Sequence, residues 1–208
     1  MTPTVKPEAT SSSNNEIQEH KIVLVGDTKV GKTTIIKSLA GNSIVGRGYS
    51  VSLKVTRKND DAFIGRIFDL RSQRYFPYLH SLFYNGAMGA IIVFDITNRD
   101  SFKSVKKWRD IIWGHSGNIP ILICGNKSDL RNDAEDQVTI SEAKELVRKL
   151  SGEHGNLIKY LEISALKNII AASEIQKADV DTIEDIYPTT EAFRKEFVNW
   201  LIAIIKKE

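Results

Sequence analysis

The chain has 208 residues, which is the size of one domain with short tails. Hydrophobic residues make up 41% and charged residues 26%, and a formal net charge of only +3 does not argue for nucleic acid or an anionic membrane surface as the partner. The single cysteine, Cys124, excludes a disulfide scaffold and a cysteine-built zinc site, and no apolar run approaches the ~18 residues of a membrane helix.

In chain order, a polar segment comes first and strand-like runs follow. Residues 1–19 are rich in Pro, Thr, Ser and Asn, so we expect a disordered tail there and a folded domain over 20–208. Apolar runs predict strands at 21–25, 50–57, 62–68, 89–94, 119–124 and 157–163. The runs at 89–94 and 119–124 are continuously apolar, which indicates a parallel sheet covered on both faces. The runs at 50–57 and 62–68 flank a polar turn and predict an antiparallel hairpin.

Helices are predicted between these strands. The segments are 32–39, one between the hairpin and residue 89, 101–113, a helix opened by the capping box Thr139-Ile-Ser-Glu142 and running to about 150, and a last helix from about Thr190. This order predicts the α/β class: a three-layer fold with helices on both faces of a six-stranded, mostly parallel sheet that has one antiparallel edge strand. The stretch 167–189 is longer than a usual connection and rich in acids, so we expect an acidic surface insertion there.

The run Gly26-Asp-Thr-Lys-Val-Gly-Lys-Thr33 matches the phosphate-loop pattern G-x-x-x-x-G-K-[ST], between a predicted strand and a predicted helix. Backbone N–H groups of such a loop form an anion nest, and the helix N-terminus adds partial positive charge. Lys32 supplies a full charge to the terminal phosphates, and the Thr33 hydroxyl can ligate Mg²⁺. Lys29 either faces solvent or lies over the phosphates, and we favour solvent because a third charge in the pocket costs desolvation.

Two further segments point to the base that is bound. Asn126-Lys-Ser-Asp129 follows a strand and resembles the N-K-x-D element of GTPases, in which the Asp accepts two N–H bonds from guanine while the Asn and Lys brace the loop. Ligands of α/β sheets bind at this carboxyl end of the strands. Glu162-Ile-Ser-Ala-Leu166 resembles the E-x-S-A-K segment that supports the base, with Leu166 where Lys is usual.

Together these segments resemble the Ras superfamily of small GTPases over about residues 20–166 and in the last helix. The run Phe94-Asp-Ile-Thr-Asn-Arg-Asp-Ser-Phe102, followed by Val105 and Trp108, is similar to a Rab motif, so the chain looks Rab-like. The resemblance implies the P-loop NTPase fold, GTP or GDP as ligand and Mg²⁺ as cofactor. The nucleotide-binding residues that it implies are Gly26, Asp27, Thr28, Lys29, Val30, Gly31, Lys32, Thr33, Thr34, Asn126, Lys127, Asp129, Ser164, Ala165 and Leu166.

The metal residues that it implies are Thr33 and Asp69, and the catalytic residue is Gln73, which would orient the attacking water. Here the chain departs from the family. Asp69-Leu-Arg-Ser-Gln73 stands where the family has D-T-A-G-Q, so Ser72 replaces a Gly whose N–H contacts the γ-phosphate. No Thr lies between Thr34 and Thr56 to serve the first switch, although Ser50 and Ser52 are near the expected position. We therefore expect weak sensing of the γ-phosphate.

Three functions remain open. The first is a Rab-like GTPase that hydrolyses GTP slowly and regulates vesicle traffic or signalling, with effector or regulatory proteins bound through its switch loops. The second is a guanine-nucleotide-binding scaffold with negligible hydrolysis, and the third, which is weak because the chain has no Arg-rich lid, is an ATP-dependent P-loop kinase. The last residues, Ile-Lys-Lys-Glu208, hold no prenylation cysteine, so the chain is either not anchored in that way or a fragment. We expect a cytoplasmic protein, peripheral on membranes through its partners, and no nucleic acid as partner.

Overall fold

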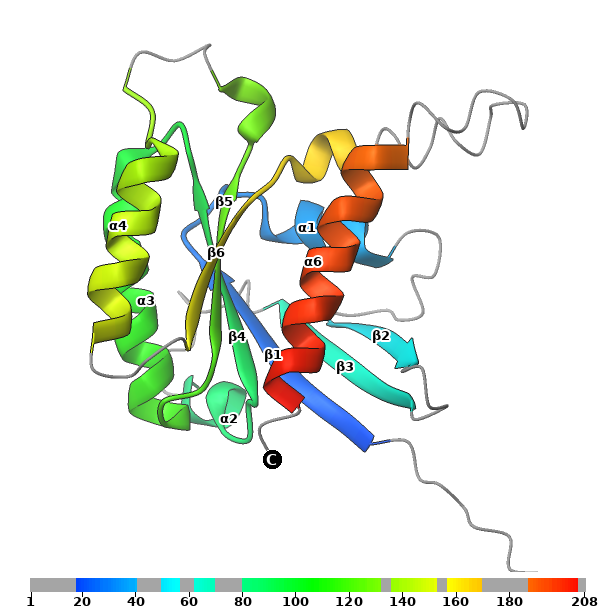
Figure 1. The fold of residues 1–208 in the computed structure, drawn as a ribbon. Coiled ribbons are helices and arrows are strands. Elements are labelled where there is room, and N and C mark those ends of the chain that lie inside the picture. Colours follow the sequence, from blue (N-terminus) through cyan, green and yellow to red (C-terminus); the bar gives the residue numbers. More distant parts are fainter. Residues whose placement is uncertain are drawn as a thin grey trace, which may run out of the picture.

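Six strands form one sheet, as the sequence predicts (Figure 1). The computed structural model describes residues 18–40, 50–56, 62–69, 80–131, 136–152, 157–169 and 187–205. Its strands are β1 (Gln18–Gly26), β2 (Ser50–Thr56), β3 (Ala62–Asp69), β4 (Gly89–Asp95), β5 (Ile121–Asn126) and β6 (Ile158–Glu162). They lie in the order β2-β3-β1-β4-β5-β6, with β2 antiparallel to β3 and the other neighbours parallel.

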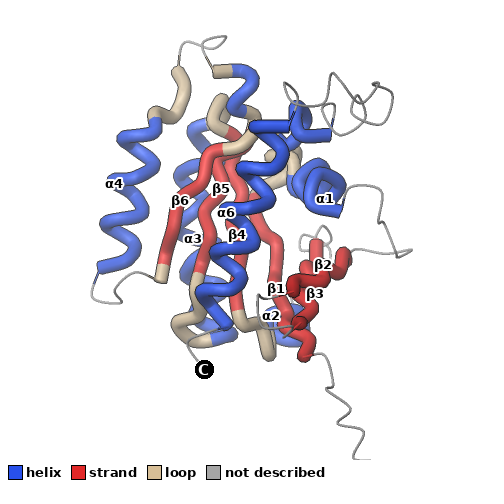
Figure 2. The backbone as a smooth tube through the Cα atoms, turned by 45° about the vertical axis from the view of Figure 1, so that its right-hand side comes forward, coloured by secondary structure: helices blue, strands red, loops and turns tan. Residues whose placement is uncertain are grey.

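Helices cover both faces of this sheet (Figures 1 and 2). They are α1 (Lys32–Ala40), the short α2 (His80–Tyr84), α3 (Arg99–Ser116), α4 (Ile140–Ser151) and α6 (Tyr187–Ile205), and a 3-10 turn, η2, spans Ser128–Leu130. Thr139 caps α4 through the predicted capping box with Glu142. Among the described residues, none of the helices is both long and apolar enough to span a membrane.

Alternation along β1 shows how the two faces are divided. Ile22 and Leu24 belong to a core shared with Ile35 of α1 and with Phe197 and Trp200 of α6, whereas Val23 and Val25 belong to a second core. That second core includes buried residues from α2, α3 and α4. Because successive side chains of a strand point to opposite faces, a continuously apolar strand packs against helices on both faces of the sheet. The continuous apolar runs therefore gave the correct three-layer arrangement.

A glycine lets α6 approach the sheet closely. A Cβ at Gly89, the first residue of β4, would lie 2.8 Å from Ile204 Cδ1 and 3.2 Å from Trp200 Cη2. Ile204 and Trp200 belong to α6, and both are buried. The absence of a side chain at this position thus sets the depth at which the last helix packs.

Several predicted boundaries are wrong. Strand β1 begins at Gln18, inside the predicted tail, because Gln18 and Glu19 pair with β3 at Phe63 and Ile64. Pairing supplies backbone hydrogen bonds that the polar composition of this segment does not suggest. Helix α6 begins at Tyr187 instead of Thr190, and residues 165–169 are helical, so the predicted insertion at 167–189 is too wide at both ends. Residues 1–17 and 170–186 lie outside the described residues.

Candidate nucleotide-binding site

The phosphate loop joins β1 to α1 at the point where the strand order reverses, between β3 and β4. Ligands bind at such a switch point in α/β sheets. Two glycines are required by close approach. A Cβ at Gly26 (φ 139°) would lie 2.2 Å from the Val93 carbonyl oxygen, and one at Gly31 (φ 97°) would lie 2.2 Å from Asn126 Nδ2. Lys29 has φ 66°, a left-handed conformation that favours glycine, and its side chain is exposed.

The two groups predicted to serve phosphate and metal lie at the base of this loop. Lys32 is buried, and its ammonium group donates to the carbonyl oxygens of Gly26 at 2.9 Å and Asp27 at 2.7 Å. Thr33 Oγ1 donates to Asp69 Oδ2 at 3.2 Å, so the hydroxyl at the start of α1 and the carboxylate at the end of β3 are in contact. Asp69 is also buried. Hard oxygen donors of this kind suit Mg²⁺, which takes few protein ligands and keeps water or phosphate for the rest.

Asn126, the last residue of β5, connects the phosphate loop to the segment Glu162–Leu166. Its Nδ2 donates to the Val30 carbonyl oxygen at 2.9 Å, and its Oδ1 accepts from the Ala165 backbone N–H at 3.1 Å. The side chain is 2% exposed, so these two hydrogen bonds are made in the interior. One buried amide thus holds together segments that are 135 positions apart in the chain (165 − 30).

The remaining base-reading residues surround Asn126. Lys127 has φ 67°, and its ammonium group pairs with the Asp95 carboxylate at the end of β4. The other Asp95 oxygen accepts from the backbone N–H and the hydroxyl of Thr97. Asp129 Oδ1 accepts from the Ser164 hydroxyl at 2.5 Å, so the carboxylate predicted to read guanine is oriented by the E-I-S-A-L segment. A carboxylate accepts about four hydrogen bonds in all, which leaves capacity for two guanine N–H donors.

Three contacts at this site were not predicted. Asp95 could have been suspected, because it is a charged residue at the carboxyl end of an apolar strand. Trp108, in α3, donates its indole N–H to Asp27 Oδ1 at 3.0 Å. Arg131 binds both oxygens of Glu162, at 2.8 and 2.7 Å, and therefore joins the segment that follows β5 to the last residue of β6. Neither of these last two contacts has a local sequence signal, because each depends on which strands are neighbours.

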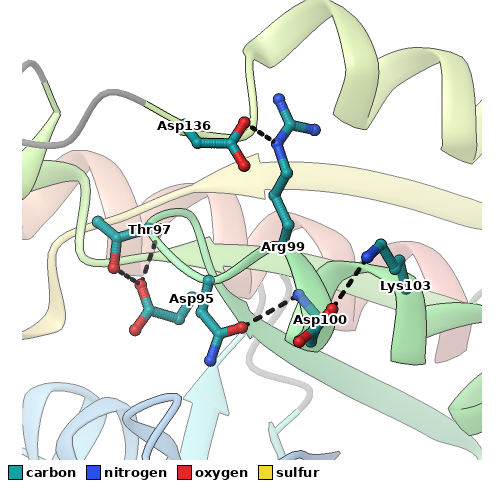
Figure 3. Close-up of a pocket in the computed structure, with 7 residues that line it drawn as sticks. Asp95, Thr97, Arg99, Asp100, Lys103 and Asp136 are labelled. Atoms are coloured by element: carbon teal, nitrogen blue, oxygen red, sulfur yellow. Dashed lines mark hydrogen bonds and ion pairs between the residues drawn. The ribbon is translucent and has the colours of Figure 1, made fainter.

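A polar hollow of about 650 Å³ lies beside the base-reading segment (Figure 3). Its charged side chains are paired: Arg99 with Asp136 at 2.5 Å, Lys103 with Asp100 at 2.9 Å, and Asp95 with Lys127. Arg99 also binds Glu142, and this contact, with further hydrogen bonds from Thr139, lowers the pKa of the Glu142 carboxyl to about 2. The charged side chains of the hollow are thus paired with one another, and the ion pairs of Arg99 hold the start of α4 and the segment before it to the start of α3.

The other predicted residues stand as follows. Thr28 and Leu166 are exposed, Thr34 is half-buried at the start of α1, and Ala165 is buried. Ser52 is exposed on β2, and nothing is described of the Ser50 side chain. Gln73 and Ser72 lie outside the described residues, as does the segment 41–49 that precedes β2. Burial raises the pKa of the Cys124 thiol to about 12, which fits the inert, buried cysteine that its apolar setting indicates.

Comparison with known proteins shows which family the chain resembles. A family model described as the Ras family matches residues 21–184. The chain is 35% identical over 176 residues to the Ras-related protein RABA2b of Arabidopsis thaliana, covering 80% of this chain and 75% of that protein. It is 32% identical to the Ras-related protein Rab11A of Lotus japonicus, covering 80% and 71% of the two chains, and 30% identical to the Ras-related protein YPTC6 of Chlamydomonas reinhardtii, covering 80% and 74%.

Proposed function

Because the chain belongs to the Ras family of small GTPases, in its Rab-like branch, we propose that it binds GDP and GTP with Mg²⁺ at the site described above and hydrolyses GTP slowly. The Rab-like motif run and the Rab-named relatives support a role in vesicle traffic or signalling. In this role effector or regulatory proteins would bind through the switch loops, and the protein would reach membranes through such partners.

The geometry around Asn126 is the observation that carries the nucleotide proposal. Its buried amide ties the phosphate loop at Val30 to the segment at Ala165. That arrangement brings Asp129 and the loop N–H groups to the same edge of the sheet. Two N–H donors of guanine suit a carboxylate, whereas adenine presents an acceptor at the corresponding ring nitrogen. The site therefore favours guanine over adenine, which is the reason to prefer a GTPase over an ATP-dependent kinase.

Phosphates and metal would be held at the other end of the site. The ammonium group of Lys32 lies within hydrogen-bond distance of the loop carbonyls, and bound phosphate oxygens would take these contacts over. The hydroxyl of Thr33 would ligate Mg²⁺ directly, and Asp69 would hold a water bound to it, as their contact at 3.2 Å allows. When bound, Mg²⁺ would neutralise the developing phosphate charge.

Slow hydrolysis follows from the switch sequences. A ligand shifts a conformational equilibrium only by its differential affinity for the two states. Two anchors on the γ-phosphate are altered, since Ser72 replaces a Gly and no Thr stands in the first-switch window. We expect GDP and GTP affinities within about tenfold, or ~1.4 kcal/mol. Gln73 supports hydrolysis at or below about 10⁻⁴ s⁻¹, the scale of unassisted Ras-type enzymes. Single-turnover loss of γ-phosphate from wild type and from Gln73→Ala separates this from a scaffold with negligible hydrolysis.

The nucleotide proposal is tested with Asp129→Asn. We expect GTP affinity to fall by about 1.5–3 kcal/mol, the scale of a hydrogen bond to a charged group, and xanthine nucleotides to bind better than GTP. Asp136→Asn is the matched control, because it makes the same chemical change in the loop that follows β5, and its carboxylate pairs with Arg99. Titration with fluorescent GDP, displaced by GTP, XTP or ATP, gives the affinities. Equal GTP affinity for Asp129→Asn and the control would overturn the guanine assignment.

A further inference from the structure

The phosphate loop is held from α3 by a contact that no motif predicts. The indole N–H of Trp108 donates to Asp27 Oδ1 at 3.0 Å. The ring of Trp108 packs against the core on the α3 side of the sheet, so the donor is fixed on a rigid element. The backbone carbonyl of the same Asp27 accepts from the Lys32 ammonium group at 2.7 Å. The residue held by α3 thus also accepts a hydrogen bond from Lys32.

The loop is fixed at two points by side chains from elsewhere in the described part of the chain. Asn126 holds the carbonyl of Val30, and Trp108 holds the side chain of Asp27. Between these points, Thr28 and Lys29 are exposed. Removal of either anchor would therefore leave one end of the loop without this support.

The hydrogen bond from Trp108 also fixes the direction of the Asp27 carboxylate. Asp27 brings a carboxylate to a loop whose N–H groups are arranged for an anion. If this carboxylate turned toward bound phosphates it would repel them, and if it turned toward Lys32 it would compete for the ammonium charge. An indole N–H can only donate, and a hydrogen bond from it to a charged acceptor is stronger than one between neutral groups. The indole therefore keeps the carboxylate directed at α3.

We propose that Trp108 is a positioning residue for nucleotide retention, which holds the Asp27 carboxylate toward α3 and so leaves Lys32 and the loop N–H groups to the phosphates. This inference rests on the proposed function, because it concerns the same phosphate loop. It assigns a role in ligand binding to a helix that contributes no residue to the nucleotide-binding motifs.

The test compares two tryptophans of α3. Trp108→Phe removes the N–H and keeps an aromatic ring in the core. Trp113→Phe is the control, because the Trp113 indole N–H also makes a hydrogen bond, at 2.9 Å, but to the carbonyl of Ile119. Release of fluorescent GDP into excess GDP is followed by stopped flow for both variants. We expect release of GDP to be about fivefold faster for Trp108→Phe. This is less than the full effect of a hydrogen bond to a charged group, because the contact is only partly buried. For Trp113→Phe we expect the release rate to change by less than about twofold.

Coupling to Asp27 distinguishes positioning from packing. In the double variant Trp108→Phe with Asp27→Asn, the displaced side chain carries no charge, so we expect release to return to within about twofold of Asp27→Asn alone. If Trp108→Phe fails to fold, replacement of Trp108 by its benzothiophene analogue, which has nearly the same shape and no N–H, repeats the measurement.

Two results would overturn the inference. One is equal release rates for Trp108→Phe and Trp113→Phe, and the other is an acceleration that persists undiminished when Asp27 is neutral. Either would leave the proposed function standing, because it would be measured on a protein that binds GDP. Failure of the wild-type protein to bind fluorescent GDP at all would overturn the proposed function and this inference with it.

Discussion

Replacement of Asn126 by Ala is the most direct test of how the site is assembled. The Asn126 side chain is only 2% exposed. The change removes its N–H donor to the Val30 carbonyl and its oxygen acceptor for the Ala165 N–H. Each buried backbone group left without its partner costs about 1–3 kcal/mol, so the two together predict a loss of about 2–6 kcal/mol. Water entering the space left by the amide would keep the loss toward the lower end, and we expect about 3 kcal/mol.

Asn98→Ala is the matched control. The Asn98 side chain also makes two hydrogen bonds, accepting from the N–H groups of Asp100 and Ser101 at the start of α3. It is an N-cap, whose replacement by Ala costs about 1 kcal/mol, and it bonds to neither Val30 nor Ala165.

Urea unfolding with and without GDP measures both the stability and the part of it that nucleotide supplies. We expect Asn126→Ala to lose most of the stabilisation by GDP and Asn98→Ala to keep it. Equal losses in the two variants, with GDP still stabilising both, would refute the assignment of Asn126 as the link between the two segments.

Three further predictions concern single charged groups. Lys32→Ala removes the charge aimed at the phosphates, so binding of GDP and GTP should fall about tenfold or more with the fold retained, and unchanged retention of radiolabelled nucleotide would contradict the phosphate-loop assignment. Lys29→Gly relieves a left-handed conformation at φ 66°. The relief of about 1–2 kcal/mol outweighs the entropic cost of glycine, about 0.5–1 kcal/mol, so the temperature of thermal denaturation should stay the same or rise. A clear fall in that temperature would show that the Lys29 side chain makes a stabilising contact. Arg99 and then Thr139 lower the pKa of Glu142 to about 2, so this group stabilises the fold above about pH 4.5 and the contribution is lost as the pH falls from there toward 2. Since the Glu142 side chain is 40% exposed, the effect should be about 1 kcal/mol or less, and urea unfolding at pH 7 and pH 3 should show a smaller pH dependence for Glu142→Gln than for wild type.

The sequence alone was enough to determine the class of the fold and to identify the loops of the candidate site. Continuous apolar runs at 89–94 and 119–124 predicted strands buried on both faces, and β4 and β5 are in fact central parallel strands. The phosphate loop could be recognised because its requirements are local. A strand, two glycines at the closest approaches and a helix start all lie within one short stretch of chain.

The tertiary structure decided which side chains meet across that edge of the sheet. Asn126 reaches Val30, Lys127 reaches Asp95, and Trp108 reaches Asp27 only because the sheet order puts β1, β4 and β5 side by side, with α3 packed beneath them. The start of β1 at Gln18 has the same origin, since a polar segment becomes a strand when a neighbour supplies its hydrogen bonds. Local pattern therefore specified the elements and the motif loops, whereas long-range pairing specified the contacts that hold those loops in place.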